Sequence, residues 1–374
     1  MMNNAETPLV VYWDEIFTAH EAKRPPIEGL VVQPPHPDDP GRVTNIQECI
    51  ETSFSGETQW KPVSPATDEA ITSVHASAHL EHLDELSSRR TGSTEAIQLG
   101  IGPKTASAAR HAAGAAIEAA MNSVQGETIP YALVRPSGHH AQSDQIEGFC
   151  YLNNVAIAAK KLLTTDKVES VAIIDWDVHH GNGTQEIFYD NSEVLYLSVH
   201  GDHRSWGMYH PQTGRPTEYG TGSGEGYTVN VPLPPGAGIQ SYEYACNHIL
   251  EPILDQYDPD AVLVSAGQDG GHVDSLGRHT LTVPGFYKLG RRVRHIATRH
   301  ADGRLAIVQE GGYHLGHLPF ATLGILEGAC GIENKTQEPY PPAEPETLDE
   351  AIRYVHQAGV VHTQFWELPF VATE

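Results

Sequence analysis

Residues 173–182 read IIDWDVHHGN, and this stretch decides the fold that we expect for the chain. Its first residues complete the apolar run VAII at 171–174, which is typical of a strand buried on both faces of a parallel sheet. Gly181 and Gly183 then end the strand pattern. A buried strand is therefore expected to end directly in carboxylates and imidazoles.

Side chains two positions apart in a strand point to the same side, so Asp175, Asp177 and His179 are expected to share one face. Two carboxylates beside an imidazole at a buried strand end are costly unless a cation or hydrogen-bond donors compensate them. Each residue alone could instead be a strand-end cap of the helix expected near Thr184, or simply exposed. Four such residues in the six positions 175–180 favour a divalent metal ion.

Apolar strand patterns alternate with helical patterns along the chain. Strands are expected at 9–13, 131–134, 171–174, 194–199, 227–231, 261–265 and 305–308, and helices at 42–52, 67–88, 106–123, 153–163, 242–256 and 284–298. This alternation is typical of parallel βαβ units, so the expected fold class is α/β with a central, mainly parallel sheet flanked by helices. No linker, repeat or low-complexity tract divides residues 1–374, which predicts a single domain.

The composition restricts the partners of the chain. Its 48 acidic and 23 basic residues give a formal net charge of -25, which argues against binding to nucleic acid or to an anionic membrane. The charge would favour cationic substrates, but an acidic surface adapted to a salty cytoplasm is the slightly preferred explanation, because the acidic residues are scattered and lysine is scarce. No stretch reaches 18 apolar residues and the first eight form no signal peptide, so a cytoplasmic location is expected. A homo-oligomer is compatible with this composition.

Several other residue patterns are interpreted as structural. The four cysteines are far apart without a CxxC pair, so reduced core residues are expected. His75, His79 and His82 are spaced to share a helix face, but no HExxH motif accompanies them and helix packing is the favoured interpretation. The glycine-rich stretch 220–226 contains no GxGxxG and precedes a strand, so we interpret it as a turn.

Polar residues gather where the expected strands stop. In parallel sheets, binding sites form beyond the carboxyl ends of the strands. Four expected strands run out at His139 and His140, at 175–180, at Gln268 and Asp269, and at the sequence EGGY in 310–313. We therefore expect these four strand ends to converge on one site.

The residue types at this site predict metal-assisted chemistry. Asp177, His179 and Asp269 would supply three ligands to a zinc ion and leave a position for water and substrate, although the same oxygen and nitrogen set also suits iron(II). His139 and His140 are suited to act as general base and acid.

Three further residues would support this chemistry. Asp175 could orient one imidazole of the histidine pair and Asn182 the other. Tyr313 could donate its hydroxyl to a developing oxyanion, whereas alone it would be interpreted as a packed tyrosine. No serine or cysteine nucleophile has a recognisable setting. The set predicts hydrolysis of an amide by metal-activated water, without a covalent intermediate.

Four motifs carry a resemblance to a known family. They are RPSGHH at 135–140, GFCYLNN at 148–154, DWDVHHGNGT at 175–184 and EGGY at 310–313. In this order they resemble the zinc-dependent histone deacetylase and acetylpolyamine amidohydrolase family, over about residues 30 to 330, with Asn182 similar to class II members and their bacterial or archaeal relatives. The resemblance implies an arginase-like, three-layer α/β fold and a deacetylase-like catalytic domain with one zinc ion per chain.

The resemblance also implies roles for individual residues. By matching positions, Asp177, His179 and Asp269 would bind zinc, His139 and His140 would form the acid/base pair, Asp175 would pair with His139, and Tyr313 would polarise the acyl carbonyl. A structural potassium ion would use Asp175, Asp177, His179, Ser198 and Val199, partly through backbone oxygens. Phe149 would line one wall of the acyl-lysine tunnel, with Gly311 also at the substrate site.

The sequence departs from the family pattern near the expected substrate. Gln268 stands in GQDG where the family usually has GFDA, and Ser137 replaces the second proline of its RPPG motif. The second tunnel aromatic would fall in MYHP at 208–211, so Tyr209 or His210 is expected on the opposing wall. Leu276 stands where polyamine-selective animal relatives have a glutamate.

These observations predict a zinc amidohydrolase that removes a small acyl group, above all acetyl, from an amine such as a lysine side chain. An acetylpolyamine or another small amide is the alternative substrate. A non-catalytic binder of acylated ligands is disfavoured because all the catalytic residue types are present. An arginase-like two-metal hydrolase is disfavoured because Gln268 and Gly270, and not carboxylates, flank Asp269.

Overall fold

The computed structural model describes residues 6–22, 29–32, 35–88, 94–205, 212–341 and 343–370. Within these residues, an eight-stranded sheet has the order β2-β1-β3-β8-β7-β4-β5-β6, and all neighbouring strands are parallel. The strands are β1 (Leu9–Tyr12), β2 (Thr58–Lys61), β3 (Ile129–Ala132), β4 (Val171–Asp175), β5 (Val194–Gly201), β6 (Thr228–Leu233), β7 (Ala261–Ala266) and β8 (Leu305–Gln309).

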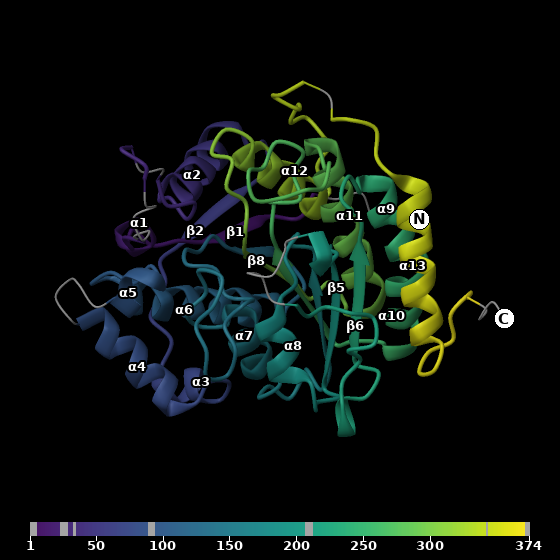
Figure 1. The fold of residues 1–374 in the computed structure, drawn as a ribbon, viewed down its shortest axis with the longest axis horizontal. Helices are drawn as coiled ribbons and strands as arrows, with labels where there is room; N and C mark the ends of the chain where they lie inside the picture. The colour runs from purple at the N-terminus through teal and green to yellow at the C-terminus, as the bar shows by residue number, and fades with distance from the viewer. Residues whose placement is uncertain are drawn as a thin grey trace.

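Helices cover both faces of this sheet (Figure 1). The helices α6 (Thr105–Ser123), α7 (Asn154–Leu162) and α8 (Asn182–Phe188) contact strands of one face. The other face is covered by α2 (Gly41–Ser53), α9 (Ile239–Ala245), α10 (Glu251–Tyr257), α11 (Val283–His300), α12 (Leu318–Cys330) and α13 (Leu348–His362). The short helices α1 (Ile16–Ala19), α3 (Asp68–Thr72), α4 (Ser77–Ser88) and α5 (Thr94–Gln98) complete the set. The expected three-layer α/β fold is confirmed.

The burial of the strands explains their sequences. All five residues of β4 are buried, and so are all residues of β5, β6, β7 and β8, because helices pack on both sides. Such strands need continuous runs of apolar residues and show no alternation of apolar and polar residues. The edge strand β2 reads TQWK and alternates between half-buried and exposed side chains, which is why its short polar pattern was not predicted as a strand.

Two helices expected to be continuous are interrupted. The expected helix at 67–88 is divided into α3 and α4, because the backbone N–H of Ala76 donates to the carbonyl of Ser143 (2.8 Å) outside the helix. The expected helix at 242–256 contains a π-helical turn at Cys246–Leu250 between α9 and α10. Pro252 follows that turn and has no N–H to donate in the regular hydrogen-bond pattern of an α-helix.

The remaining elements add no membrane segment or disulfide to the described part of the chain. No described helix is both long enough and apolar enough to cross a membrane. All four cysteines are free thiols, and three of them are buried, as expected for reduced core residues.

Candidate metal centre and active site

The sheet order brings the four polar strand ends together. Strands β3, β8, β7 and β4 are consecutive neighbours in the sheet, so the segments that follow them meet at one edge. Hydrogen bonds join these segments: Gly138 N donates to Glu310 Oε2 (2.8 Å), and Gly311 N donates to Asp177 Oδ2 (2.8 Å). The convergence expected from the sequence is therefore present in the structure.

Asp177, His179 and Asp269 form a compact group of possible metal ligands. The Nδ1 atom of His179 lies 3.0 Å from Oδ2 of Asp269 and 3.3 Å from Oδ1 of Asp177. Backbone amides hold the carboxylates: Val178 N donates to Asp269 Oδ1 (2.9 Å), and His179 N donates to Asp177 Oδ1 (2.9 Å). All three side chains are buried, so the group is a preformed cluster and not a set of surface residues.

Two glycines leave the space that this cluster occupies. A Cβ atom at Gly311 would lie 2.1 Å from Asp269 Oδ2 and 2.6 Å from Asp177 Oδ2, and one at Gly267 would lie 2.1 Å from Asp177 Oδ2. The donor set of two carboxylates and one imidazole is suited to a divalent transition metal such as zinc. The residues present therefore fit a metal ion.

The charges of the cluster also favour a cation. Burial, together with the carboxylate of Asp177, raises the pKa of Asp269 to about 7. Burial opposes protonation of His179, but the two carboxylates outweigh it and raise the pKa of this imidazole to about 10. Without a metal ion the cluster therefore retains protons that a bound divalent cation would displace.

His139 and His140 lie side by side with their ring centroids 4.1 Å apart. The Nδ1–H of His139 donates to Asp175 Oδ2 (3.0 Å), and the Nδ1–H of His140 donates to Asn182 Oδ1 (2.7 Å). The amide of Asn182 is oriented by its Nδ2, which donates to Glu147 Oε2 (2.7 Å). Each imidazole is thus held by its Nδ1 and presents its Nε2 away from that partner.

The environments of these two imidazoles shift their pKa values in opposite directions. Burial opposes the charged form of His139, but Asp177 and Asp175 outweigh it and raise the pKa of His139 well above its usual value. Burial lowers the pKa of His140 well below its usual value, and the neighbouring His139 adds to this effect. Adjacent groups whose pKa values are driven apart are suited to opposite acid and base roles.

Glu310 supports the histidine pair and was not assigned a role from the sequence. Its carboxylate is fully buried and accepts hydrogen bonds from Gly138 N and from His139 N (3.2 Å). Burial raises its pKa to about 7. The sequence offered one indication of this role, the position of Glu310 at the start of the EGGY motif. The hydrogen-bond partners of Glu310 could not be predicted, because they are mostly backbone amides, which every residue type except proline provides.

Tyr313 is positioned by its backbone and by a buried arginine. Tyr313 N and His314 N donate to Asp274 Oδ2 (2.6 and 3.0 Å). The guanidinium of Arg42 lies over the ring, 4.6 Å from its centroid. Burial raises the pKa of Tyr313 well above its usual value, Arg42 opposes this and the charges of Asp269 and Asp177 add to it, so the phenol remains protonated at neutral pH.

Arg42 and its partner Asp38 are further supporting residues that sequence reasoning missed. Arg42 donates to the carbonyl of Gly312 through Nε, to the carbonyl of Glu310 through Nη2, and to Asp38 Oδ1 through Nη1, each at 2.5 Å. Arg135 also donates to Asp38 Oδ1 (3.1 Å). The only sequence signal was the i, i+4 spacing of Asp38 and Arg42, which is also common in exposed pairs.

The predicted potassium ligands lie beside this site. Ser198 on β5 is in register with Asp175 on β4, and both are fully buried. The hydroxyl of Ser198 lies 2.8 Å from Nδ1 of His200, and Tyr196 donates its hydroxyl to Asp175 Oδ2 (3.0 Å). Val199, the next residue of β5, is also buried. The potassium assignment stays a prediction.

The predicted substrate residues occupy different surroundings. Phe149 has φ 64° and its ring centroid lies 6.3 Å from that of Tyr313, whereas Tyr209 and His210 lie outside the described residues. Gln268 is 1% exposed, and its Oε1 accepts a hydrogen bond from Gln309 Nε2 (2.6 Å), which places this side chain in the interior. Leu276 is half-buried.

The three histidines at 75, 79 and 82 have other partners. His75 Nδ1–H donates to the carbonyl of Gln142 (2.9 Å), and His75 Nε2 accepts from Asn153 N (2.9 Å). His79 Nε2 lies 2.7 Å from the carbonyl oxygen of Tyr151. These contacts attach α4 and the turn that precedes it to the rest of the chain, in agreement with the packing interpretation.

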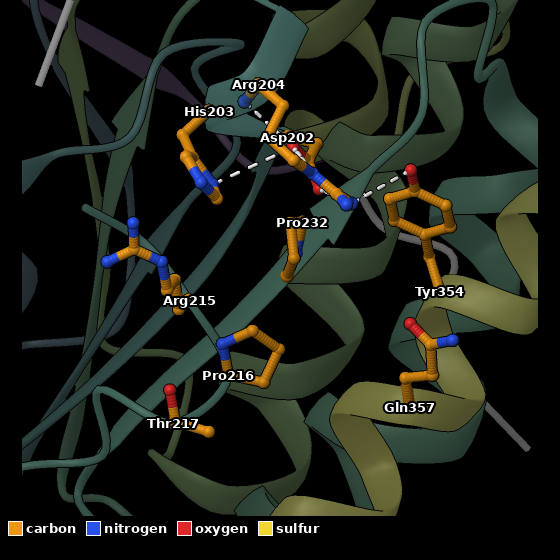
Figure 2. Close-up of a pocket in the computed structure, with 9 residues that line it drawn as sticks. All are labelled: Asp202, His203, Arg204, Arg215, Pro216, Thr217, Pro232, Tyr354 and Gln357. Carbon is orange, nitrogen blue, oxygen red and sulfur yellow. Dashed lines mark hydrogen bonds and ion pairs between the residues drawn. The ribbon is translucent and has the colours of Figure 1, made fainter. Parts of the chain in front are cut away.

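A separate surface pocket of about 360 Å³ lies between the carboxyl ends of β5 and β6 and helix α13 (Figure 2). Arg204 donates to Asp202 Oδ2 (2.6 Å) and to the hydroxyl of Tyr354 (3.1 Å) at its rim. Its described lining includes Arg215 but none of the residues predicted for the active site. The pocket is therefore distinct from the metal cluster.

Comparisons with known proteins agree with this geometry. A family model, the histone deacetylase domain, matches residues 36–328. Histone deacetylase 8 of Arabidopsis thaliana is 36% identical, over 96% of this chain and 97% of that protein. The histone deacetylase-like amidohydrolase of Pseudomonas aeruginosa is 36% identical, over 88% of this chain and 87% of that protein. The solved HD domain of HDA15 superposes with a TM-score of 0.83 and 30% identity, over 96% of this chain and 95% of that one. The chain therefore belongs to the histone deacetylase family and is a deacetylase or amidohydrolase of that family.

Proposed function

We propose that this protein hydrolyses the amide of an acetylated amine, such as the acetylated side chain of lysine, with one zinc ion held by Asp177, His179 and Asp269. The observation that carries the proposal is the pair His139 and His140. Their imidazoles are adjacent to the metal cluster and have pKa values shifted in opposite directions. A binding module would have no need of such a pair.

A zinc ion in this cluster would supply Lewis acidity toward a water molecule and an acyl oxygen. His140 is neutral and donates Nδ1–H to Asn182, so we assign its Nε2 as the base that takes a proton from the attacking water. Asp175 holds the Nδ1–H of His139, and the charges of Asp177 and Asp175 favour the protonated ring, so we assign its Nε2–H as the donor toward the leaving amine. Tyr313 would donate its hydroxyl to the acyl oxygen.

We further propose that Phe149, Tyr209 or His210, Gln268, Leu276 and Gly311 determine the fit of the substrate. The position of the Phe149 ring near Tyr313 supports its assignment to a wall beside the reacting carbonyl. Gln268 would act through the backbone, since its N donates to Gly311 O (3.0 Å) and its side chain is buried. A potassium ion near Asp175, Asp177, His179, Ser198 and Val199 would offset part of the buried negative charge.

An acetylated polyamine is the second candidate substrate, because a net charge of -25 favours a cationic ligand over a neutral one. Leu276 is half-buried and uncharged, so it supplies no carboxylate to bind such a cation. This residue therefore favours acetyl-lysine over an acetylated polyamine as the substrate. Residues 1–374 would work as one catalytic domain, in keeping with the 96% of the chain that matches a relative of nearly the same length.

The proposal is tested by incubating the zinc-loaded protein with acetyl-lysine peptides, acetylated polyamines and small alkyl amides, and by measuring the acetate released. Tyr313→Phe should lower kcat by about 100-fold, as for loss of one oxyanion donor, with the zinc content unchanged. Tyr354→Phe is the matched control, because it removes a tyrosine hydroxyl from the separate pocket and should leave turnover unchanged.

Each outcome distinguishes the alternatives. Acetate from acetyl-lysine peptides alone supports the first substrate, and acetate from acetylated polyamines alone supports the second. No turnover of any amide by the zinc-loaded protein would refute catalysis and favour a binder of acylated ligands. Equal turnover by Tyr313→Phe and the control would remove the phenol from the chemistry.

A further inference from the structure

A second cluster of metal-ligating side chains lies outside the active site and consists of His272, His317 and Glu338. His272 Nε2 lies 3.3 Å from Glu338 Oε1, and His317 Nε2 lies 3.2 Å from Glu338 Oε2. The exposed fractions of the three side chains are 6% for His272, 1% for His317 and 15% for Glu338. This set is not among the residues predicted from the sequence.

The distances within the cluster match those between neighbouring ligands of one metal ion. Zinc holds nitrogen and oxygen ligands at about 2.0–2.2 Å, so the ligand atoms at the corners of a tetrahedron are roughly 3.4 Å apart. Each imidazole nitrogen lies at about this distance from one oxygen of Glu338, His272 Nε2 from Oε1 and His317 Nε2 from Oε2. One ligand atom from each of the three residues also lies within 4.8 Å of the other two. Two imidazoles and one carboxylate also form a known zinc ligand set.

Ordinary hydrogen bonding accounts for only one of the two imidazoles, since His317 Nε2 and Glu338 Oε2 form a hydrogen bond (3.2 Å). The Nε2 atom of His272 is buried and makes no hydrogen bond, although Glu338 Oε1 lies 3.3 Å away. A buried polar nitrogen without a hydrogen bond requires an explanation. A metal ion between the three side chains would satisfy it.

The surroundings of Glu338 orient it as a ligand. Val283 N donates to Glu338 Oε2 (2.9 Å), and Tyr340 N donates to Glu338 Oε1 (3.2 Å). Each carboxylate oxygen therefore has one backbone donor and faces one imidazole. The backbone donors of the first cluster hold Asp177 and Asp269 in the same way, and such outer hydrogen bonds fix the orientation of metal ligands.

The backbone close to His317 is shaped to admit its ring. A Cβ atom at Gly271 would lie 2.9 Å from both Nδ1 and Cε1 of His317, so a larger residue there would displace the imidazole. The rings of His272 and His317 pack edge to face with centroids 5.3 Å apart. The two imidazoles are therefore fixed relative to each other.

We propose that His272, His317 and Glu338 form a second site for a divalent metal ion of the zinc type, with water in its fourth coordination position. The site would join three segments: the loop after β7, the residue that precedes α12, and the segment between α12 and α13. The first segment also carries Asp274, which holds the backbone of Tyr313. The ion would therefore stabilise the loops on which the active-site tyrosine rests.

The proposal is tested by counting metal ions per chain. Metal-free protein is dialysed to equilibrium against buffered Zn²⁺, and bound zinc is measured by mass spectrometry. Wild-type protein should hold two zinc ions, Glu338→Gln one, Asp177→Asn one and the double variant none. A wild-type protein that holds a single ion, or a Glu338→Gln variant that holds as many as the wild type, would overturn the second site.

Glu95→Gln is the matched control, because Glu95 pairs with one exposed histidine, His82 (3.0 Å), and with no second imidazole among the residues that the structure describes. It should retain two zinc ions. Cobalt spectroscopy covers the case in which Glu338→Gln does not fold. Asp177→Asn loaded with Co²⁺ should retain visible absorption bands of a tetrahedral ion, and this absorption should disappear in Asp177→Asn/His272→Gln. A cobalt-loaded Asp177→Asn without such bands would refute the proposal.

Discussion

Replacing Gly311 by alanine tests whether the metal cluster has the geometry described above. The new Cβ would lie 2.1 Å from Asp269 Oδ2, whereas real Cβ contacts essentially never fall below 3.0 Å, so the two atoms must separate by about 0.9 Å or more. Metal ligands tolerate displacements of about 0.2 Å. The effect is steric, because φ at Gly311 is not in the left-handed region that would itself disfavour alanine.

The size of the loss follows from the residues that must move. Changes to groups that only orient metal ligands typically weaken binding by about 10-fold to 100-fold, which is about 1.4–2.7 kcal/mol. Gly311→Ala displaces a ligand directly and also pushes toward Asp177 Oδ2, at 2.6 Å. We therefore expect zinc affinity to fall by about 100-fold or more.

Competition with a chromophoric chelator measures this affinity, and thermal unfolding of the metal-free proteins monitors the fold. Gly270→Ala is the matched control, because Gly270 is next to Asp269 in the chain but the nearest atoms to its new Cβ would belong to Leu281 (3.2 Å), Tyr242 (3.5 Å) and His279 (3.9 Å). It should bind zinc like the wild type. An affinity of Gly311→Ala within about twofold of the control would refute the assigned cluster geometry.

Two further predictions concern stability. Arg42→Lys keeps the positive charge but cannot reproduce the three hydrogen bonds that the planar guanidinium donates. We therefore expect the free energy of unfolding, measured in urea, to fall by on the order of 3 kcal/mol. An unchanged free energy of unfolding would contradict the role assigned to these three hydrogen bonds. Burial and His79 lower the pKa of His75 to about 4, against about 6.5 when unfolded. The folded state therefore binds fewer protons, so this histidine contributes stability that is complete above pH 6.5 and decreases as the pH falls toward 4, by about 2 kcal/mol at pH 5. Urea unfolding of His75→Gln at about pH 7 and pH 5 should show a smaller pH dependence than the wild type, and equal pH dependences would refute the assigned neutral imidazole.

The arrangement of the fold was largely accessible from the sequence because the central strands are buried on both faces. A short continuous apolar run, such as VAII at 171–174, is typical of such a buried strand and could therefore be recognised in the sequence. Helix α12 was not predicted, since its residues are nearly all buried and give no amphipathic periodicity. The break between α3 and α4 also escaped prediction, because it depends on a backbone hydrogen bond from Ala76 to the distant Ser143.

The site residues could be anticipated only where several polar side chains follow one strand. Asp177, His179 and Asp269 were chosen in this way, and the structure brings them together. Arg42 could not be chosen, because two of its three acceptors are backbone carbonyls, which any residue could provide. His317 lies in a different segment from its partners, and no spacing rule connects a histidine to residues 45 and 21 positions away.

The buried carboxylates of this protein are compensated in different ways. Asp38 is paired with the guanidinium groups of Arg42 and Arg135, which hold its pKa well below the usual range. Glu310 accepts two backbone N–H groups, and burial raises its pKa to about 7, so a proton can neutralise it. Asp175 has a phenol and an imidazole as partners. None of these carboxylates requires a divalent metal ion.

The pair Asp177 and Asp269 differs because two carboxylates face the single imidazole of His179. When both carboxylates are ionised, even a protonated His179 leaves this cluster one positive charge short, and burial makes this deficit costly enough to raise the pKa of Asp269 to about 7. A divalent cation removes the deficit and leaves the imidazole neutral, which is the form that binds metal. The shortage of charge thus identifies the position of the metal within a group of buried acids, and the imidazole pair beside it explains why the same position is suited to hydrolysis.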